Sequence, residues 1–277
     1  MRRAAAVVAA ALLIAAVLPR PASAAGDRPS WNVGDFWRYE GYTIVIAQLD
    51  LARRFEVAAL EGLTQAGVTY STVKAVQTDT TTVPFIGATT VVSNAWLRTT
   101  DLAFLKTEVA AAQTTTAYDP PAGLYQFPLV NGRAWSVSTT RTITIGAGSS
   151  SGQVTFDLSV TSETDLTVQV VQNGQSVTKA FHTFVVRQED ESGSGFWLFS
   201  YADEVGYFLK QEHWANANTK NTELTLKEFK YTPPTNFVLL VLILAVFLVA
   251  VIVAALLLRR KPPTPQPVAQ YQVQPAR

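Results

Sequence analysis

Apolar side chains recur at every second position through most of residues 26–235, which is the pattern of β-strands with one buried face. These stretches are rich in Val, Thr, Ile and aromatic residues, which favour strands. The clearest alternating runs lie at residues 136–145, 154–160, 165–171 and 224–231. Asn173-Gly174 lies between two such runs and is typical of a two-residue hairpin turn. Because the region has no persuasive helical stripe, the sequence predicts an all-β, antiparallel fold.

Several landmarks occur twice at nearly constant spacing. Trp96 precedes a Phe-Leu-Lys phrase that begins at Phe104, and Trp197 precedes the same phrase at Phe208. Upstream, the phrase that ends at Trp37 has a counterpart that ends at Trp135, 98 residues later. These landmarks predict two β-rich halves of about 100 residues, 31–118 and 127–231, in which Trp96 and Trp197 lie on matching strands. The alternative is chance similarity among hairpins rich in Trp and Gly.

A long apolar segment follows the β-rich region. Residues 237–258 contain no charged and no polar side chain, and a helix of this length crosses a hydrocarbon core of about 30 Å. Arg259, Arg260 and Lys261 come directly after it, which predicts a single transmembrane helix with its C-terminal flank in the cytoplasm. The cytoplasmic tail, residues 259–277, is rich in Pro and Gln and is expected to be disordered or polyproline-like.

The N-terminus has the features of a secretory signal peptide. Arg2 and Arg3 precede an apolar run at 4–18, and the small residues at 22–24 supply a cleavage pattern. The sequence therefore predicts a signal peptide at 1–25 and an extracytoplasmic β domain at 26–235, with an uncleaved signal anchor as the alternative. The expected location is the cell membrane, with a single span, the N-terminal domain outside and the C-terminus in the cytoplasm.

The charge of the exported region differs from that of the whole chain. Seven of the 22 basic residues lie outside residues 26–235, whereas all 21 acidic residues lie inside, so this region has a net charge of −6. Phosphate binding needs a basic patch. The mildly acidic balance therefore argues against nucleic acid as a partner.

The sequence contains no convincing catalytic or metal site. There is no Cys, and the two His residues, His182 and His213, are not at ligand spacing. A site built across strands from these His residues and nearby acids (Glu189, Asp190, Asp203) is a minor alternative. The contiguous acids at 189–191 lack the alternating spacing of calcium loops and are expected to be solvated. We expect no enzymatic activity, no cofactor and no bound metal.

Three short phrases resemble a family of exported proteins. Residues 33–39 (VGDFWRY), 127–135 (FPLVNGRAW) and 201–212 (YADEVGYFLKQE) are similar to phrases of exported proteins with a lipoprotein-carrier-like β fold. The resemblance implies a strongly curved antiparallel sheet, or half-barrel, whose apolar concave face can hold acyl chains. Those carriers are free or lipid-anchored, whereas this chain has a predicted span. Its layout resembles that of archaeal single-span surface proteins.

The leading hypothesis is a membrane-anchored surface protein whose β domain binds an apolar or lipid-like ligand, such as a fatty acid or isoprenoid, or an envelope partner. The Trp residues are most simply core anchors. Four of them are candidates for contacts with an apolar ligand: Trp37, Trp96, Trp135 and Trp197. The alternative is a structural or adhesive module with no small-molecule ligand, and a third hypothesis is an extracellular hydrolase. An empty apolar cavity would favour the first hypothesis over the second, and a cleft that combines a His with carboxylates would favour the third.

Overall fold

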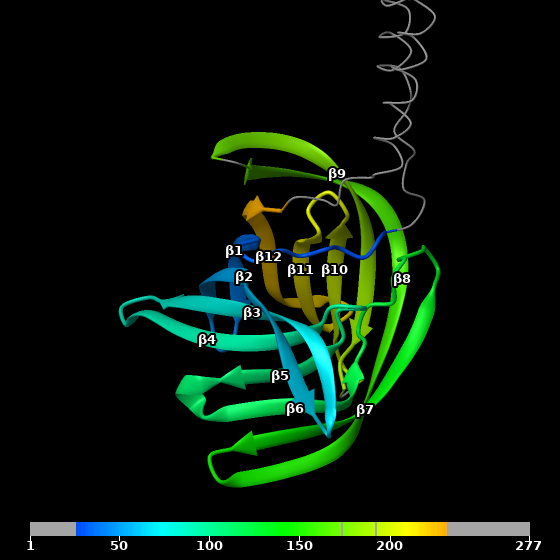
Figure 1. Ribbon diagram of the computed structural model, residues 1–277. Helices are drawn as coiled ribbons and strands as arrows, with labels where there is room; N and C mark the ends of the chain where they lie inside the picture. Colours follow the sequence, from blue (N-terminus) through cyan, green and yellow to red (C-terminus); the bar gives the residue numbers. More distant parts are fainter. Residues whose placement is uncertain (1–25, 173, 192, 232–277) are drawn as a thin grey trace, which may run out of the picture. The chain divides into compact units, whose positions relative to one another are not determined.

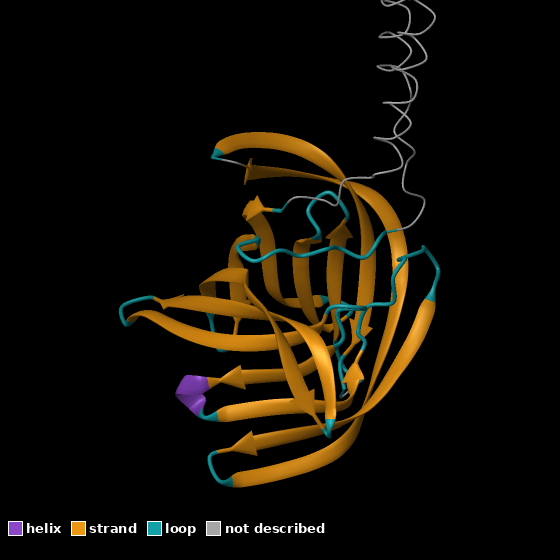
Figure 2. Cartoon of the chain, in the orientation of Figure 1, coloured by secondary structure: helices purple, strands orange, loops and turns teal. Residues whose placement is uncertain are grey.

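Strands dominate the computed structural model, which describes residues 26–172, 174–191 and 193–231 (Figures 1 and 2). These residues belong to one compact unit, Ser23–Pro234. The first six strands are β1 (Phe36–Ile44), β2 (Gln48–Gln65), β3 (Val68–Val83), β4 (Gly87–Arg98), β5 (Phe104–Val109) and β6 (Thr114–Ala122), with a short 3-10 helix, η1 (Ala110–Ala112), before β6. The other six are β7 (Ala134–Ile145), β8 (Gly148–Gln172), β9 (Gln175–Glu189), β10 (Phe196–Ala202), β11 (Tyr207–Asn216) and β12 (Thr219–Lys230).

The sheet closes into a barrel, because each strand pairs with its neighbours in the chain and β1 pairs with β12. The β1–β12 ladder runs antiparallel from the Phe36–Lys230 pair to the Thr43–Thr222 pair. The prediction of an all-β, antiparallel fold is confirmed, but the expected half-barrel with an open concave face is wrong. Alternation along the chain shows which residues form strands and which face they bury. It does not show whether strands 179 residues apart in the sequence meet.

The seam between β1 and β12 requires a close approach of the two backbones. Gly41 on β1 lies opposite Leu224 on β12. A Cβ atom at position 41 would overlap the carbonyl oxygen of Glu223. Only glycine therefore fits at this point of the ladder.

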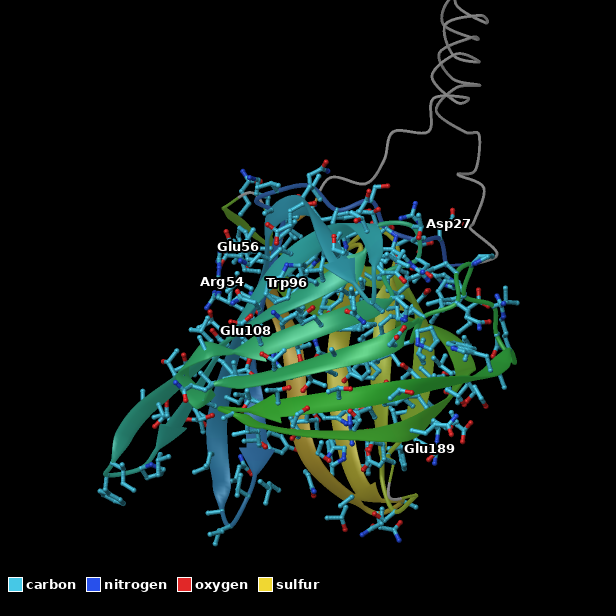
Figure 3. All side chains as sticks on the ribbon, turned by 60° about the horizontal axis from the view of Figure 1, so that its bottom comes forward. Asp27, Arg54, Glu56, Trp96, Glu108 and Glu189 are labelled. Atoms are coloured by element: carbon cyan, nitrogen blue, oxygen red, sulfur yellow. The ribbon has the colours of Figure 1, made fainter. Side chains whose placement is uncertain are left out.

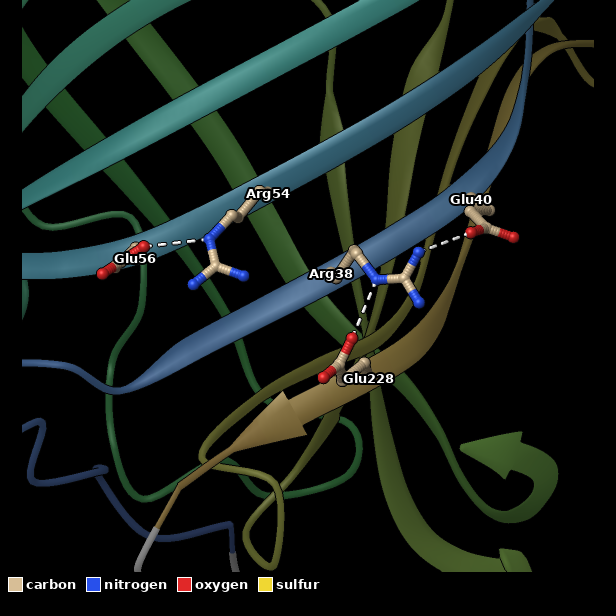
Figure 4. Close-up of polar contacts among 5 residues, drawn as sticks. All are labelled: Arg38, Glu40, Arg54, Glu56 and Glu228. Atoms are coloured by element: carbon tan, nitrogen blue, oxygen red, sulfur yellow. Dashed lines mark hydrogen bonds and ion pairs between the residues drawn. The ribbon is translucent and has the colours of Figure 1, made fainter. Parts of the chain in front are cut away.

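Ion pairs cross the outer face of the same seam (Figure 4). Arg38 on β1 donates from Nε to Glu228 Oε2 on β12 at 3.0 Å, and from Nη1 to Glu40 Oε1 at 2.8 Å. On β2, Arg54 donates to Glu56 Oε2 at 2.9 Å. These side chains are partly exposed, so each pair adds little free energy, about 0.2–1 kcal/mol.

The same pattern of hydrogen bonds precedes β1 and β7, the first strands of β1–β6 and of β7–β12. Gly34 N donates to Val57 O at 2.8 Å, and Val57 N donates to Asp35 O at 2.9 Å. Six strands later, Gly132 N donates to Val160 O at 2.9 Å, and Val160 N donates to Arg133 O at 2.8 Å. Both glycines have a positive φ, 89° and 81°.

The turn between β4 and β5 also matches the turn between β10 and β11. Leu102 N donates to Arg98 O at 2.8 Å, and Gly206 N donates to Ala202 O at 2.9 Å. Leu102 and Gly206 both adopt the left-handed conformation, with φ of 58° and 67°. The same backbone path is therefore built from a buried leucine in one turn and from a glycine in the other.

Trp96 lies on β4 and Trp197 on β10, six strands apart, but the register places them differently. The register of the β4–β5 ladder shifts after Trp96, and the next pair is Leu97–Phe104. The register of the β10–β11 ladder shifts after Ser200, and the next pair is Tyr201–Phe208. Ser200 therefore occupies the position that matches Trp96, and Trp197 lies three residues earlier. The equivalence of halves 31–118 and 127–231 stays a prediction, which the matched turns favour.

One hairpin extends past the barrel wall as an arm and turns back onto the barrel. The β8–β9 hairpin continues beyond Val160, and Val171 and Gln172 at its tip pair in parallel with the end of β12. Phe181 on this arm is buried, and its ring centroid lies 6.4 Å from that of Phe229. The arm thus adds apolar side chains to the core beyond the barrel wall.

The buried apolar residues form two clusters inside the barrel. Phe104, Phe127 and Tyr207 pack against both clusters and join them into a continuous interior. The segment before β1 contributes Trp31, whose ring centroid lies 5.5 Å from that of Trp37. This N-terminal segment therefore packs into the barrel.

The predicted signal peptide (1–25), the predicted transmembrane helix (237–258) and the predicted tail (259–277) lie outside the described residues. Within the part that the structure describes, no helix is long and apolar enough to cross a membrane. The membrane span therefore stays a prediction from the sequence.

Gly206 offers a test of the β10–β11 turn. A Cβ atom there would overlap the ring of Tyr231, whereas Gly67, also with a positive φ, has open space around it. We expect Gly206→Ala to lower the free energy of unfolding by about 2–4 kcal/mol, from left-handed strain and overpacking together, and Gly67→Ala by about 1 kcal/mol, from strain alone. Urea unfolding followed by Trp emission measures both values. Equal losses would contradict the close contact with Tyr231.

Candidate functional site

Trp37 is a core residue with its polar atom satisfied. Its side chain is fully buried, and its Nε1 donates to Val205 O at 2.7 Å. Its ring centroid lies 5.2 Å from that of Tyr207 and 6.0 Å from that of Phe55. Protein side chains therefore cover the whole surface of Trp37.

Trp96 lies on the outer face of the sheet (Figure 3). Its neighbours Ala95 and Leu97 belong to the core, and successive side chains on a strand point to opposite faces. Lys74 and Lys106 lie over its ring, 5.2 Å and 4.9 Å from the centroid. Its Nε1 donates to Glu61 Oε1, on β2, at 2.6 Å. Trp96 is thus buried beneath charged surface side chains, away from the barrel interior.

Trp135 and Trp197 are half-buried. Trp135 packs against the second core cluster, and its buried Nε1 has no hydrogen-bond partner. The ring of Trp197 stacks on Phe199 at 5.7 Å and lies 4.8 Å from His213. No ring contact joins any two of Trp37, Trp96, Trp135 and Trp197. Their role as contacts to an apolar ligand stays a prediction, and the structure does not bring the four together.

The aromatic interior is filled by the chain's own side chains. Phe55 and Tyr207 stack at 4.8 Å between ring centroids, and Trp31 contacts both. The space left between Trp31, Phe104 and Phe127 is about 10 Å³, whereas pockets for drug-sized ligands measure about 300–1,000 Å³. A space of this size is at the limit for one water molecule. The expected empty apolar cavity is therefore not found at this aromatic core.

A band of polar side chains lies beside the aromatic core. Arg53 donates from Nε and Nη2 to the two carboxylate oxygens of Asp79, at 2.8 and 2.9 Å, and from Nη1 to Gln211 Oε1 at 2.9 Å. Burial opposes the charge of Arg53, but the hydrogen bonds and the charge of Asp79 outweigh it and raise the pKa of the guanidinium. Burial also raises the pKa of Tyr39 and Tyr207, which keeps both phenols neutral. The band is a satisfied structural network.

The acidic residues at the end of β9, 189–191, were expected to be solvated, but each also contacts a basic side chain. Glu189 accepts from Arg187 Nε at 2.6 Å, and Glu191 accepts from Arg141. Asp190 hydrogen-bonds His213 Nε2 at 2.9 Å. These three acids also line a polar cleft of about 590 Å³. Three of the carboxylates that line the cleft therefore have basic partners, and the fourth, Asp157, accepts from the Ser136 hydroxyl.

The two His residues lie in separate places. His213 contacts Asp190, whereas His182 contacts Glu163 and Asp165. Among the described residues, no group of three or more His, Asp or Glu side chains could hold a metal ion. His213 is not among the residues that line the acidic cleft, although it contacts Asp190, which does. The absence of enzymatic activity stays a prediction.

Exposed apolar residues, here called the apolar rim, lie at three turns of one end of the barrel, and the sequence analysis missed them. Its residues are exposed and lie at the turns β1–β2, β3–β4 and β7–β8: Ile44, Val45, Ile46, Phe85, Ile86 and Ile145. The first two turns are neighbours, because β2 and β3 pair up to Asp50 and Thr82. Turns usually contain Gly, Asn, Asp, Pro or Ser. Apolar residues at turn positions were the signal that could have revealed the rim.

Comparison with known proteins shows little likeness. No family model matches the sequence, and no curated protein matches it. A candidate lipoprotein from Parabacteroides distasonis ATCC 8503 is 11% identical, with a TM-score of 0.31, over 74% of this chain and 99% of that chain. A candidate exported protein with a YmcC-like fold from Bacteroides fragilis NCTC 9343 is 11% identical, with a TM-score of 0.33, over the same shares. Such weak likeness adds no argument about function, and it gives no support to the archaeal layout.

The Arg53–Asp79 pair can be tested by single and double replacement. We expect Arg53→Met to lower the free energy of unfolding by about 2–4 kcal/mol, because Asp79 then stays partly buried without a counter-charge. The double variant Arg53→Met/Asp79→Leu should regain most of that loss, since removing both charges is nearly neutral. Arg54→Met, which breaks an exposed pair on the same strand, serves as the matched control and should cost at most about 1 kcal/mol. A double variant as unstable as the single one would contradict this view.

His182 should give the stability a small pH dependence. Hydrogen bonding to Asp165 raises the pKa of His182, burial opposes this slightly, and Glu163 adds to it. A pKa that is raised in the folded state stabilises the fold at pH values below the unfolded-state pKa of about 6.5. This stabilisation is lost as the pH rises through the folded-state pKa. Urea unfolding at pH 5.5 and 8.5 should show a difference of a few tenths of a kcal/mol that His182→Gln and high salt both remove. Identical pH profiles of the wild type and the variant would disprove the assignment.

Proposed function

We propose that this chain is a structural or adhesive cell-surface module whose barrel is a scaffold for contacts with an envelope partner. The observation that supports the proposal is the filled interior: the aromatic core leaves about 10 Å³ where an acyl chain would need a cavity more than tenfold larger. At the aromatic core, the space is therefore occupied by the chain's own side chains. The structural or adhesive module was the alternative in the sequence analysis, and the envelope partner was part of the leading hypothesis.

The polar band beside the aromatic core supports the same proposal. Arg53, Asp79 and Gln211 satisfy one another, and Tyr39 donates its hydroxyl to Phe208 O at 2.7 Å. Buried polar groups that wait for a ligand would be left unpaired in its absence. The described polar band stabilises the barrel without a ligand.

The exposed residues favour contact through the outside. The side chains of Ile46 and Phe85 are essentially fully exposed, at 99% and 109% of a reference residue. A group of exposed apolar residues at one end of a soluble domain is typical of an interaction surface. The signal peptide and the span are part of the proposal, and they place this surface outside the cell, at the barrel end opposite the last described residue, Tyr231.

A lipid-like ligand is the alternative that the test must separate. We expect a fluorescent fatty acid probe, titrated into the purified full-length chain with Trp emission as readout, to show no saturable binding up to about 10 μM. Phe104 lines the small remaining space, so Phe104→Ala enlarges it and should increase probe binding if the probe can enter at all. This variant shows that the assay detects interior space.

The opposite result would overturn the proposal. Saturable micromolar binding to the wild type, about −8 kcal/mol, together with its loss in Phe104→Trp, would place a ligand in the interior. The carrier-like hypothesis would then replace the scaffold hypothesis.

A further inference from the structure

Part of β4 is paired on one side only. β4 pairs with β3 along its whole length, from the Thr72–Arg98 pair to the Val83–Gly87 pair. It pairs with β5 only from Asn94 to Leu97, because β5 ends at Val109 and the chain turns into η1. Among the described residues, 87–93 therefore form a strand edge with no strand beside it. Backbone N–H and C=O groups along such an edge are free to pair with another strand.

The chemistry of this edge lacks the usual protection against strand addition. The sequence from Gly87 to Ser93 is GATTVVS, with no charge and no proline, and the β3–β4 ladder has no bulge. Natural edges are commonly blunted by charged residues, proline or bulges. Val91 and Val92 are each 45% exposed. The edge thus combines free backbone groups with exposed β-branched side chains, which favour strand pairing.

Two of the other one-sided stretches differ in these respects. Residues 175–183 of β9 lie beyond the β9–β10 ladder and carry Lys179 and His182. The one-sided stretch of β8, residues 148–157, faces the cleft lined by Glu189 and Glu191 and contains two glycines. The β4 edge is uncharged and continues into the apolar rim at Phe85 and Ile86.

We propose that the β4 edge binds a second copy of this chain by antiparallel strand addition, β4 against β4, about a two-fold axis. This names the partner of the proposed scaffold and rests on that function. A two-fold interface brings the same patch of both molecules together, so the patch must complement itself. An uncharged edge does so, because no like charges meet, although each exported domain has a net charge of −6.

The register explains what covers the neighbouring apolar residues. With Thr90 on the axis, Val91 pairs with Thr89 of the partner subunit, and both are β-branched residues that pack well across strands. Pairing stops at residue 93 of the partner subunit, where β5 takes over the edge, so Ile86 in the turn before β4 comes against η1 of the partner subunit, whose three alanines are exposed and lie close to β4. The dimer therefore buries part of the apolar rim as well as the free edge.

The absence of Cys from the chain allows a test without background. Residues directly opposite each other in an antiparallel pair have Cα atoms about 4.5–5.5 Å apart, within the range that a disulfide bridges. We expect single Cys variants of the full-length chain, scanned from Ala88 to Val92 in intact cells under mild oxidation, to give a disulfide-linked homodimer. The yield should peak at the axis, with Thr90→Cys at least fivefold above the ends of the scan.

Thr80→Cys is the matched control. Thr80 faces Thr90 across the β3–β4 ladder, with their hydroxyl oxygens 3.2 Å apart, but β3 is paired on both sides. It should therefore give no dimer. Adding Val91→Lys to Thr90→Cys should reduce the dimer at least tenfold, because two lysines then lie at the paired edge, while unchanged Trp emission shows that the barrel is folded.

Three results would overturn the proposal. They are no dimer at any position of the scan, equal yields for Thr80→Cys and Thr90→Cys, or a linked product whose mass identifies a different protein. None of these depends on fatty acid binding, so a failure of the dimer is distinguishable from a failure of the scaffold function.

Discussion

The pairing of β1 with β12 is the constraint on which the rest of the structure depends. It is the one junction of the barrel between strands that are not neighbours in the chain. The close approach at Gly41 brings Leu224 and Leu226 of β12 into the same buried cluster as Trp37 and Tyr39 of β1. Without that seam, the sheet would have two free edges and an open face, and the aromatic interior would be exposed to water.

Closure also determines what the interior can do. A closed barrel with about twelve strands has room for more than its inward side chains, and this chain uses the room for large aromatic rings and for a polar band. Trp31 from the N-terminal segment and Phe181 from the β8–β9 arm add apolar volume from outside the wall. The same filling that stabilises the fold leaves little space for a ligand at the aromatic core, whereas the rim and the unpaired strand edges stay accessible for recognition.

The sequence predicted the parts of this fold that depend on local pattern. Alternation of apolar residues identified the strands, and the repeated phrases around Trp37 and Trp135 fall on β1 and β7, whose first turns share hydrogen bonds. The closed seam was missed because no local signal reports a partner 179 residues away. Trp96 was treated with the core residues because of its size alone, whereas two lysines and a carboxylate cover it on the outer face.

The acidic loop and the apolar rim were missed for related reasons. The bases that pair with residues 189–191 come from β7, from β9 and from β11, and two of them come close only through the pairing of strands along the sheet. The rim combines turns that are about 40 or more residues apart in the sequence. The one-sided part of β4 was invisible because it depends on where β5 ends, and the boundaries of strands are the least certain part of a pattern.

The order of strands has a consequence for how the chain reaches its native state during export. Nine of the twelve strands pair only with sequence neighbours and can form hairpin by hairpin as the polypeptide emerges, N-terminus first. The seam cannot form until β12, the last strand, has crossed, and β12 ends only a few residues before the predicted span. On the proposed topology, barrel closure and arrest in the membrane would therefore be nearly simultaneous, and until that moment the aromatic interior would stay open to solvent.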